Sequence, residues 1–150
     1  GAGWQGCCAK TAGDLIRTYL DCARHYGRPD LQQDAMSLAR WLTTVQTVEG
    51  GLPTAALRSH NPPVVFNTAI VILGWRRVTQ ETGSLEFEEC IDRAAAFVTA
   101  AQDEDGAWRR FSNKSGHPHA HAYDAMAAWA LLVAHQAGGH RGRSTVRHSA

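Results

Sequence analysis

The chain has 150 residues, of which 44% are hydrophobic and 19% charged, and its formal net charge is +1. This composition is typical of one folded globular domain and excludes an intrinsically disordered chain. The near-zero net charge provides no long-range attraction to nucleic acid or to an anionic membrane. No apolar run approaches the roughly 20 residues that cross a bilayer, so we expect neither a nucleic-acid partner nor a membrane one.

The spacing of the cysteines and the first residues of the chain indicate the cellular compartment. The four cysteines, at positions 7, 8, 22 and 90, lack metal-ligand spacing of the C-x-x-C kind. We therefore expect reduced thiols, a cytoplasmic protein, no bound metal and no cofactor. The chain begins Gly-Ala-Gly, without Met or a signal-peptide pattern, which leads us to expect a trimmed chain or a piece of a longer protein.

Helical spacing of apolar residues begins after the first ten positions. It predicts a first helix, capped by Thr11 or Asp14 and ended by a left-handed residue at Gly27. Asp30 opens a pattern that resembles a capping box and predicts a second helix, with apolar residues as far as Val45. The short link between these two helices predicts an antiparallel hairpin.

Three further helices follow a surface loop at residues 54–63. The third, residues 64–80, is apolar nearly all round in its first half, which predicts burial on more than one side. The fourth carries apolar positions over residues 87–101, and the fifth spans residues 120–136. Because strand-like alternation is absent, the fold class is all-α.

The same local sequence recurs after 56 residues, which indicates one structural unit used more than once. The offset relates Gln46 to Gln102, Glu49 to Asp105, Gly50 to Gly106, and Gly27 to Gly83. We therefore expect the second and fourth helices to be equivalent, with the two glutamines in matching junctions. The predicted organisation is a loosely ordered segment at residues 1–10, a hairpin-repeat domain at residues 11–137 and a basic, flexible tail at residues 138–150.

These junctions resemble the Q-x-x-x-G-x-W motif of α/α-toroid proteins. Gln102, Gly106 and Trp108 match the motif, whereas the earlier junction has Leu52 in place of tryptophan. The resemblance implies antiparallel helical hairpins arranged as a partial toroid. One branch of that architecture contains squalene-cyclase and protein-prenyltransferase repeats, and the other contains glycan-processing barrels such as the six-hairpin glycosidases.

The stretch Pro-Val-Val-Phe-Asn-Thr-Ala at residues 63–69, followed by Gly74, is similar to bacterial polysaccharide-associated toroid proteins. That similarity implies a carbohydrate-active or carbohydrate-binding domain with a small-molecule or glycan ligand. The alternatives are an isoprenoid cyclase or prenyltransferase relative, whose D-x-D-D acid motif is absent, and a non-enzymatic helical-repeat scaffold. An isoprenoid site should be lined by aromatic residues alone, whereas a sugar site should combine polar and aromatic residues.

Histidines dominate the segment His-Pro-His-Ala-His at residues 117–121. Three imidazoles in an extended segment can converge on a metal ion, but no further ligand completes a tetrahedral site. We instead place His119, His121 and Tyr123 as candidate catalytic groups at the mouth of a toroid, where they can bind or protonate a sugar. A solvated loop is the alternative.

Four other residues are candidates for binding a substrate: Asn67, Trp108, Arg109 and Asp124. The 56-residue offset relates Asn67 to Tyr123 and Thr68 to Asp124, which places two polar pairs at equivalent rims. Helix capping by Thr68 and Asp124 is the alternative. Trp108 either covers a hairpin junction or stacks on a sugar ring. Three other tryptophans follow the core phases of their helices and are expected to pack: Trp41, Trp75 and Trp129.

The acidic run Asp103-Glu104-Asp105 is the densest carboxylate cluster in the sequence. Paired carboxylates suit glycoside chemistry, but an acidic residue and a glycine after a helix-ending glutamine also make a turn. We favour the turn.

The five expected helices make up only part of a closed toroid. Hairpin repeats bury their apolar faces against neighbours, so five helices leave two open edges. The polar residues after Gly138 cannot cover an apolar face. We therefore expect a homodimer joined through helical edges, or a fragment of a longer chain.

Overall fold

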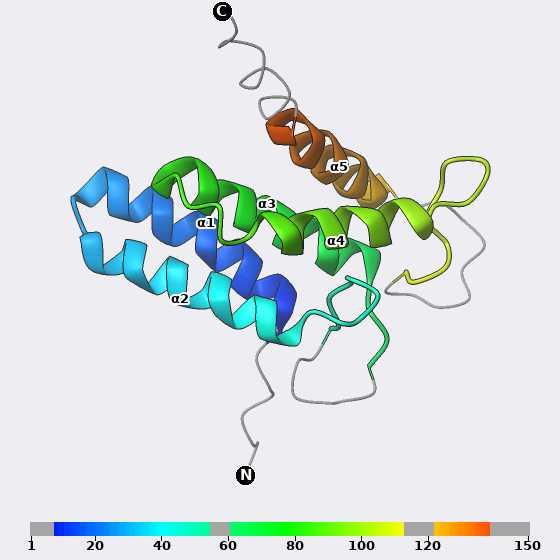
Figure 1. Ribbon diagram of the computed structural model, residues 1–150, viewed down its shortest axis with the longest axis horizontal. Coiled ribbons are helices and arrows are strands. Elements are labelled where there is room, and N and C mark those ends of the chain that lie inside the picture. Colours follow the sequence, from blue (N-terminus) through cyan, green and yellow to red (C-terminus); the bar gives the residue numbers. More distant parts are fainter. Residues whose placement is uncertain (1–7, 55–60, 113–121, 139–150) are drawn as a thin grey trace, which may run out of the picture.

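The computed structural model describes residues 8–54, 61–112 and 122–138. These residues form α1 (Ala9–Tyr26), α2 (Pro29–Val45), α3 (Val65–Thr82), α4 (Glu88–Ala100), the 3-10 helix η1 (Ala122–Asp124) and α5 (Ala125–Gly138) (Figure 1). Within the described ranges, the single extended pairing is an isolated bridge between Pro53 and Pro63. The all-α prediction is confirmed.

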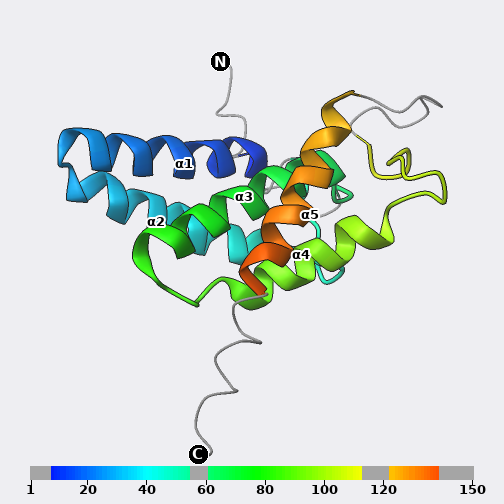
Figure 2. The same cartoon turned by 90° about the horizontal axis from the view of Figure 1, so that it is seen from above.

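The helices form two antiparallel hairpins, α1–α2 and α3–α4, followed by α5 (Figures 1 and 2). Helix α3 packs against both α1 and α5, while α2 packs against α1 and α4 packs against α3. Gly27 and Gly83 end α1 and α3 in the left-handed conformation, with φ of 62° and 70°, as predicted.

Helix α3 is the centre of the core, and its residues from Val71 to Arg76 are all buried. Two glycines allow its close contact with α1, since a Cβ on Gly13 would lie 3.1 Å from Ile70 and one on Gly74 would lie 3.0 Å from the carbonyl oxygen of Gly13. The indole N–H of the fully buried Trp75 donates to the Ala39 carbonyl at 3.0 Å, which ties α3 to α2. The burial on more than one side expected for this helix is therefore found.

The turn after α2 and the turn after α4 share one geometry. In the first, the Gln46 side-chain amide donates to the Gly50 carbonyl at 2.8 Å, and in the second Gln102 donates to Gly106 at 2.9 Å. The glycines have matching positive φ values of 94° and 86°. The backbone N–H of Thr47 donates to Gly51, as that of Asp103 donates to Ala107. The predicted match between the two glutamine junctions is confirmed.

The two junctions differ in what covers them. The Gln46 amide nitrogen also donates to the Cys90 carbonyl of α4 at 2.9 Å, and the Arg93 guanidinium donates to the Thr47 carbonyl at 2.7 Å. A Cβ on Gly50 would lie 2.3 Å from the Arg93 carbonyl oxygen. Helix α4 therefore locks the first turn, whereas no helix among the described residues covers the second in this way.

Two expected helix caps are wrong. Helix α1 begins at Ala9, and neither Thr11 nor Asp14 caps it; Asp14 instead accepts from Lys10 at 2.6 Å. Helix α2 begins at Pro29, because a proline suits the first helical position. Asp30 consequently lies inside the helix and pairs with Arg28.

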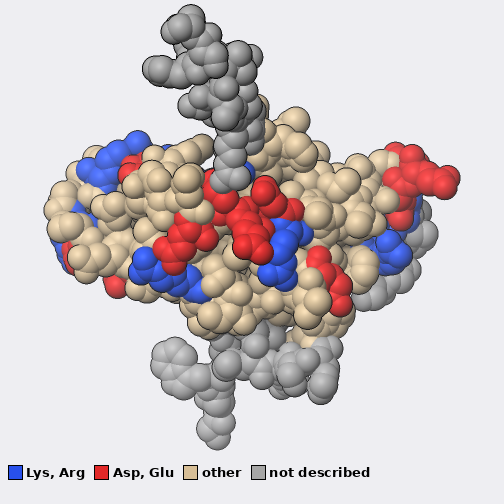
Figure 3. Space-filling view, viewed as in Figure 1, with Lys and Arg blue, Asp and Glu red and all other residues tan. Residues whose placement is uncertain are grey.

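The surface of α4 and α5 shows both charge and exposed apolar groups. Acidic side chains gather over the first half of α4 (Figure 3). Glu89 and Asp92 of this helix are exposed, and so is Glu86, just before its start. Carboxylates near a helix start are favourable because they face its positive dipole end.

Trp129 of α5 is 46% exposed, so the expectation that it packs in the core is wrong. None of the helices in the described part of the chain is long and apolar enough to cross a membrane.

Candidate functional site

Two chain segments meet at the start of α3. The segment after α2 pairs with it through Val64, whose N–H donates to the Leu52 carbonyl at 2.9 Å. The segment after α4 pairs with it through Val65, whose N–H donates to the Phe111 carbonyl at 3.0 Å. Both donors belong to the unsatisfied N–H groups that every helix start presents. The first turn of α3 therefore fixes both segments relative to one another.

Asn67 and Thr68 lie in this first turn and are both buried. The Thr68 hydroxyl donates to the Val64 carbonyl at 2.8 Å and accepts from the Leu52 N–H at 2.9 Å. Thr68 thus holds the incoming segment, and the alternative of N-capping is wrong for it, since Val64 is the N-cap and has no side-chain cap bond.

Asn67 was a candidate binding residue and is only 2% exposed. Its amide nitrogen donates to the Thr54 hydroxyl at 3.3 Å. Thr54 itself is exposed. Asn67 therefore acts on this surface by orienting Thr54.

A cleft of about 490 Å³ opens beside these residues. Its polar lining consists of Thr54, Asn61 and Ser112, and its apolar lining consists of Pro62, Pro63, Val64 and Phe111. We call it the Thr54 cleft. It brings hydroxyl and amide groups together with an aromatic ring and proline rings, which is the combination expected of a site for a sugar.

Phe111 forms one wall of the Thr54 cleft and has an unusual backbone. Its φ of 63° is the only positive value for a non-glycine residue within the described ranges. Its ring packs against that of Phe97 with centroids 5.3 Å apart, and the Arg110 guanidinium lies 5.2 Å from its centroid. Such backbone strain is maintained only where surrounding contacts compensate it, and it often accompanies functional surfaces. The sequence pattern gave no indication of this residue.

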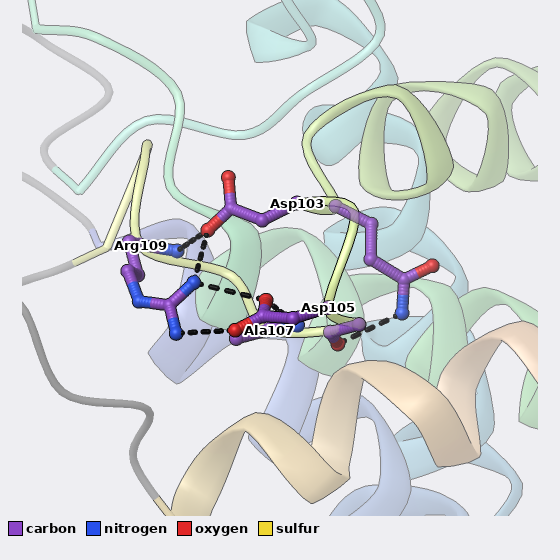
Figure 4. A network of polar contacts seen from close by, with 6 residues as sticks. Asp103, Asp105, Ala107 and Arg109 are labelled. Carbon is purple, nitrogen blue, oxygen red and sulfur yellow. Dashed lines mark hydrogen bonds and ion pairs between the residues drawn. The ribbon is translucent and has the colours of Figure 1, made fainter.

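The acidic turn after α4 is closed by Arg109 (Figure 4). One guanidinium nitrogen of Arg109 donates to Asp103 at 3.0 Å and to Asp105 at 2.9 Å, and the other donates to Asp105 at 2.6 Å. Hydrogen bonds from Arg109 and from the Ala107 N–H lower the pKa of Asp105 to about 2. A carboxyl group with that pKa is ionised at neutral pH and donates no proton.

Arg109, a candidate ligand-binding residue, is therefore engaged by the carboxylates of its own turn. The same ion pairs raise the pKa of its guanidinium. The arrangement supports the interpretation of the acidic run as a structural turn.

Trp108 is only 5% exposed, and its indole N–H donates to the Val98 carbonyl at 2.8 Å. A ring buried to this extent has no free face for stacking on a sugar, so the structure gives Trp108 the role of covering the junction. Asp124, at the end of η1, is 9% exposed and also buried.

The other candidate residues lie outside what the structure describes. His119 and His121 fall in the undescribed range 113–121, and of Tyr123 only the backbone, in η1, is described. Their expected grouping with Trp108 or Arg109 stays a prediction. Among the residues that the structure does describe, no three histidine, cysteine or acidic side chains are placed to hold a metal ion.

The ion-pair turn predicts a specific titration. Replacing Arg109 with glutamine should raise the pKa of Asp105 from about 2 towards the ordinary value of 3.8, because the largest cause of the shift is the Arg109 hydrogen bond. A depressed carboxyl pKa stabilises the fold above the unfolded-state pKa, and this contribution is lost as the pH falls towards 2. Carboxyl ¹³C NMR titration measures it.

The neighbouring Arg110→Gln variant is the control, since Arg110 bonds to the Ala100 carbonyl and to neither carboxylate. A wild-type Asp105 that titrates near pH 4 would contradict the ion-pair account of this turn.

No protein-family model matches the chain, and neither does any curated protein or solved structure.

Proposed function

We propose that this chain is a carbohydrate-binding domain built from α/α-hairpin repeats of the toroid type, with the Thr54 cleft as its ligand site. One observation carries the proposal: the cleft combines Thr54, Asn61 and Ser112 with the ring of Phe111. Hydroxyl and amide groups can donate to and accept from sugar hydroxyls. The flat apolar walls suit the C–H face of a pyranose ring.

The lining of the Thr54 cleft also distinguishes a sugar ligand from an isoprenoid ligand. An isoprenoid substrate has no hydroxyl groups along its chain, so Thr54, Asn61 and Ser112 would lose hydrogen bonds to water without replacement. A sugar replaces those bonds. The polar lining therefore favours a carbohydrate over an isoprenoid ligand.

Catalysis on a bound sugar would depend on His119, His121 and Tyr123, the candidate catalytic residues. The chain that leaves the cleft at Ser112 continues to these residues. Imidazole groups titrate near neutral pH and are suited to general acid–base chemistry on a bound sugar. The binding proposal does not depend on them.

A Thr54→Val variant tests the site. It removes the hydroxyl that Asn67 orients while keeping the side-chain shape, so it should weaken binding of the best sugar roughly three- to tenfold, as one lost hydrogen bond does. Thermal shift against a panel of neutral and acidic mono- and oligosaccharides finds that sugar, because binding to the native state raises the melting temperature. Isothermal titration then gives the affinities.

Thr44→Val is the matched control, since Thr44 is an exposed threonine on α2 that bonds within its own helix. The proposal fails if no sugar raises the melting temperature, or if both variants weaken binding equally.

A second candidate function is docking of another copy of this chain at the open edge formed by α4 and α5. The specific observation is Gln102: among the described residues its side-chain amide nitrogen reaches only Gly106, whereas Gln46 also reaches a neighbouring helix. A groove of about 620 Å³ between α4 and α5 is lined mainly by alanines, among them Ala96, Ala100 and Ala134. Small side chains allow a helix to approach closely.

Exposed leucines supply the test of this second candidate. Leu132 on α5 is 62% exposed, and Leu85, in the link between α3 and α4, is 67% exposed. At micromolar concentration we expect sedimentation to show a dimer that Leu132→Glu dissociates and Leu85→Glu does not. A wild-type monomer, or equal dissociation by both variants, would refute the docking of a second copy.

A further inference from the structure

A third cavity, of about 360 Å³, lies in a groove over α3 between α1 and α5. Four of its lining residues are arginines, with Arg17 and Arg24 on α1 and Arg76 and Arg77 on α3. We call it the arginine groove. It shares no residue with the Thr54 cleft, so a ligand here is independent of the proposed sugar site.

The carboxylates near the arginine groove neutralise only part of its charge. Arg77 pairs with two carboxylates, at 2.7 Å from Asp21 and 2.9 Å from Glu81. Arg24 approaches the same two carboxylates at 3.8 and 3.9 Å with an exposed side chain, and such pairs contribute little.

Arg17 has no carboxylate within ion-pair distance in the part of the chain that the structure describes. The four arginines face only three carboxylates, counting Glu88, which pairs with Arg76. One positive charge is therefore left over, and it lies on the α1 side of the groove.

The fourth arginine is buried. Arg76 is 2% exposed and donates to Glu88 and, at 3.0 Å, to the Ala134 carbonyl. Its Nε–H is also buried and has no hydrogen-bond acceptor among the described residues. Burial of an incompletely bonded guanidinium is unfavourable, and an anion in the groove would reduce that electrostatic cost.

Trp129 provides a flat apolar wall. Trp129 belongs to α5 and is 46% exposed, and the Arg17 guanidinium lies 5.7 Å from its ring centroid. A guanidinium positioned over an aromatic ring is held in place by cation–π attraction while its N–H groups remain able to donate. Arg17 is thus positioned beside an exposed aromatic side chain, and within the described part of the chain its N–H groups make no hydrogen bond.

We propose that the arginine groove binds a small molecule with an oxyanion, either a carboxylate or a phosphate, on a ring that lies against Trp129. The planar guanidinium group of Arg17 matches the two oxygens of either oxyanion. Arg24 adds a second donor from the next turns of the same helix. The indole ring covers the apolar face of the ligand.

Isothermal titration of the full chain at low ionic strength tests the proposal with glucuronate, glucose 1-phosphate and neutral glucose. At least one of the two anions should bind at millimolar concentration or below and more tightly than glucose. The tighter anion identifies the oxyanion as carboxylate or phosphate. Arg17→Gln should weaken that binding about tenfold, since it removes the uncompensated charge. Arg24→Gln, at an exposed position, should weaken it less.

Arg28→Gln is the matched control, because Arg28 is an exposed arginine at the start of α2 that pairs with Asp30 outside the groove. It makes the same change in net charge and should alter the affinity less than about twofold. Two results would overturn the proposal: neither anion binding more tightly than glucose, or Arg17→Gln and Arg28→Gln weakening the binding equally.

Discussion

One side-chain nitrogen, the amide nitrogen of Gln46, connects the two hairpins. It donates to the Gly50 carbonyl at 2.8 Å, which closes the turn after α2, and to the Cys90 carbonyl at 2.9 Å, which fixes that turn against α4. A carboxamide nitrogen carries two hydrogens, so both bonds can form at full strength. The close approach of Arg93 of α4 leaves no room for a side chain on Gly50, which holds the turn after α2 against α4.

The segment that leaves this turn determines where the Thr54 cleft forms. Leu52 is held by Thr68 and Val64 in the first turn of α3, and Thr54 follows two residues later. The equivalent segment after α4 returns to the same helix start through Phe111. Both repeats therefore deliver their exit segments to one end of α3. The Thr54 cleft lies where these two exit segments meet.

Features that depend on local geometry, such as the two turns, were predictable from the sequence. The same glutamine-to-glycine spacing makes the same turn at Gln46 and at Gln102, and the offset was sufficient to identify it. Properties that depend on neighbouring helices were not predictable. Periodicity placed Trp129 on an apolar face but did not show that this face stays open. Arg76 is charged and was not expected in the core, where Glu88 compensates it. Thr54 lies in an irregular segment, where no periodic signal exists.

The turns after α2 and α4 share one geometry, but α4 locks only the first, and a matched pair of glycine substitutions measures that difference. Gly106→Ala should lower the free energy of unfolding by ~1–2 kcal/mol, the cost of a side chain at positive φ, because a Cβ there meets only the Gln102 side chain at 3.8 Å. Gly50→Ala should cost a further ~1–3 kcal/mol, because its Cβ would lie 2.3 Å from the Arg93 carbonyl oxygen. Urea denaturation followed by circular dichroism gives both values. A larger loss for Gly50→Ala is the predicted result, and equal losses would contradict the account.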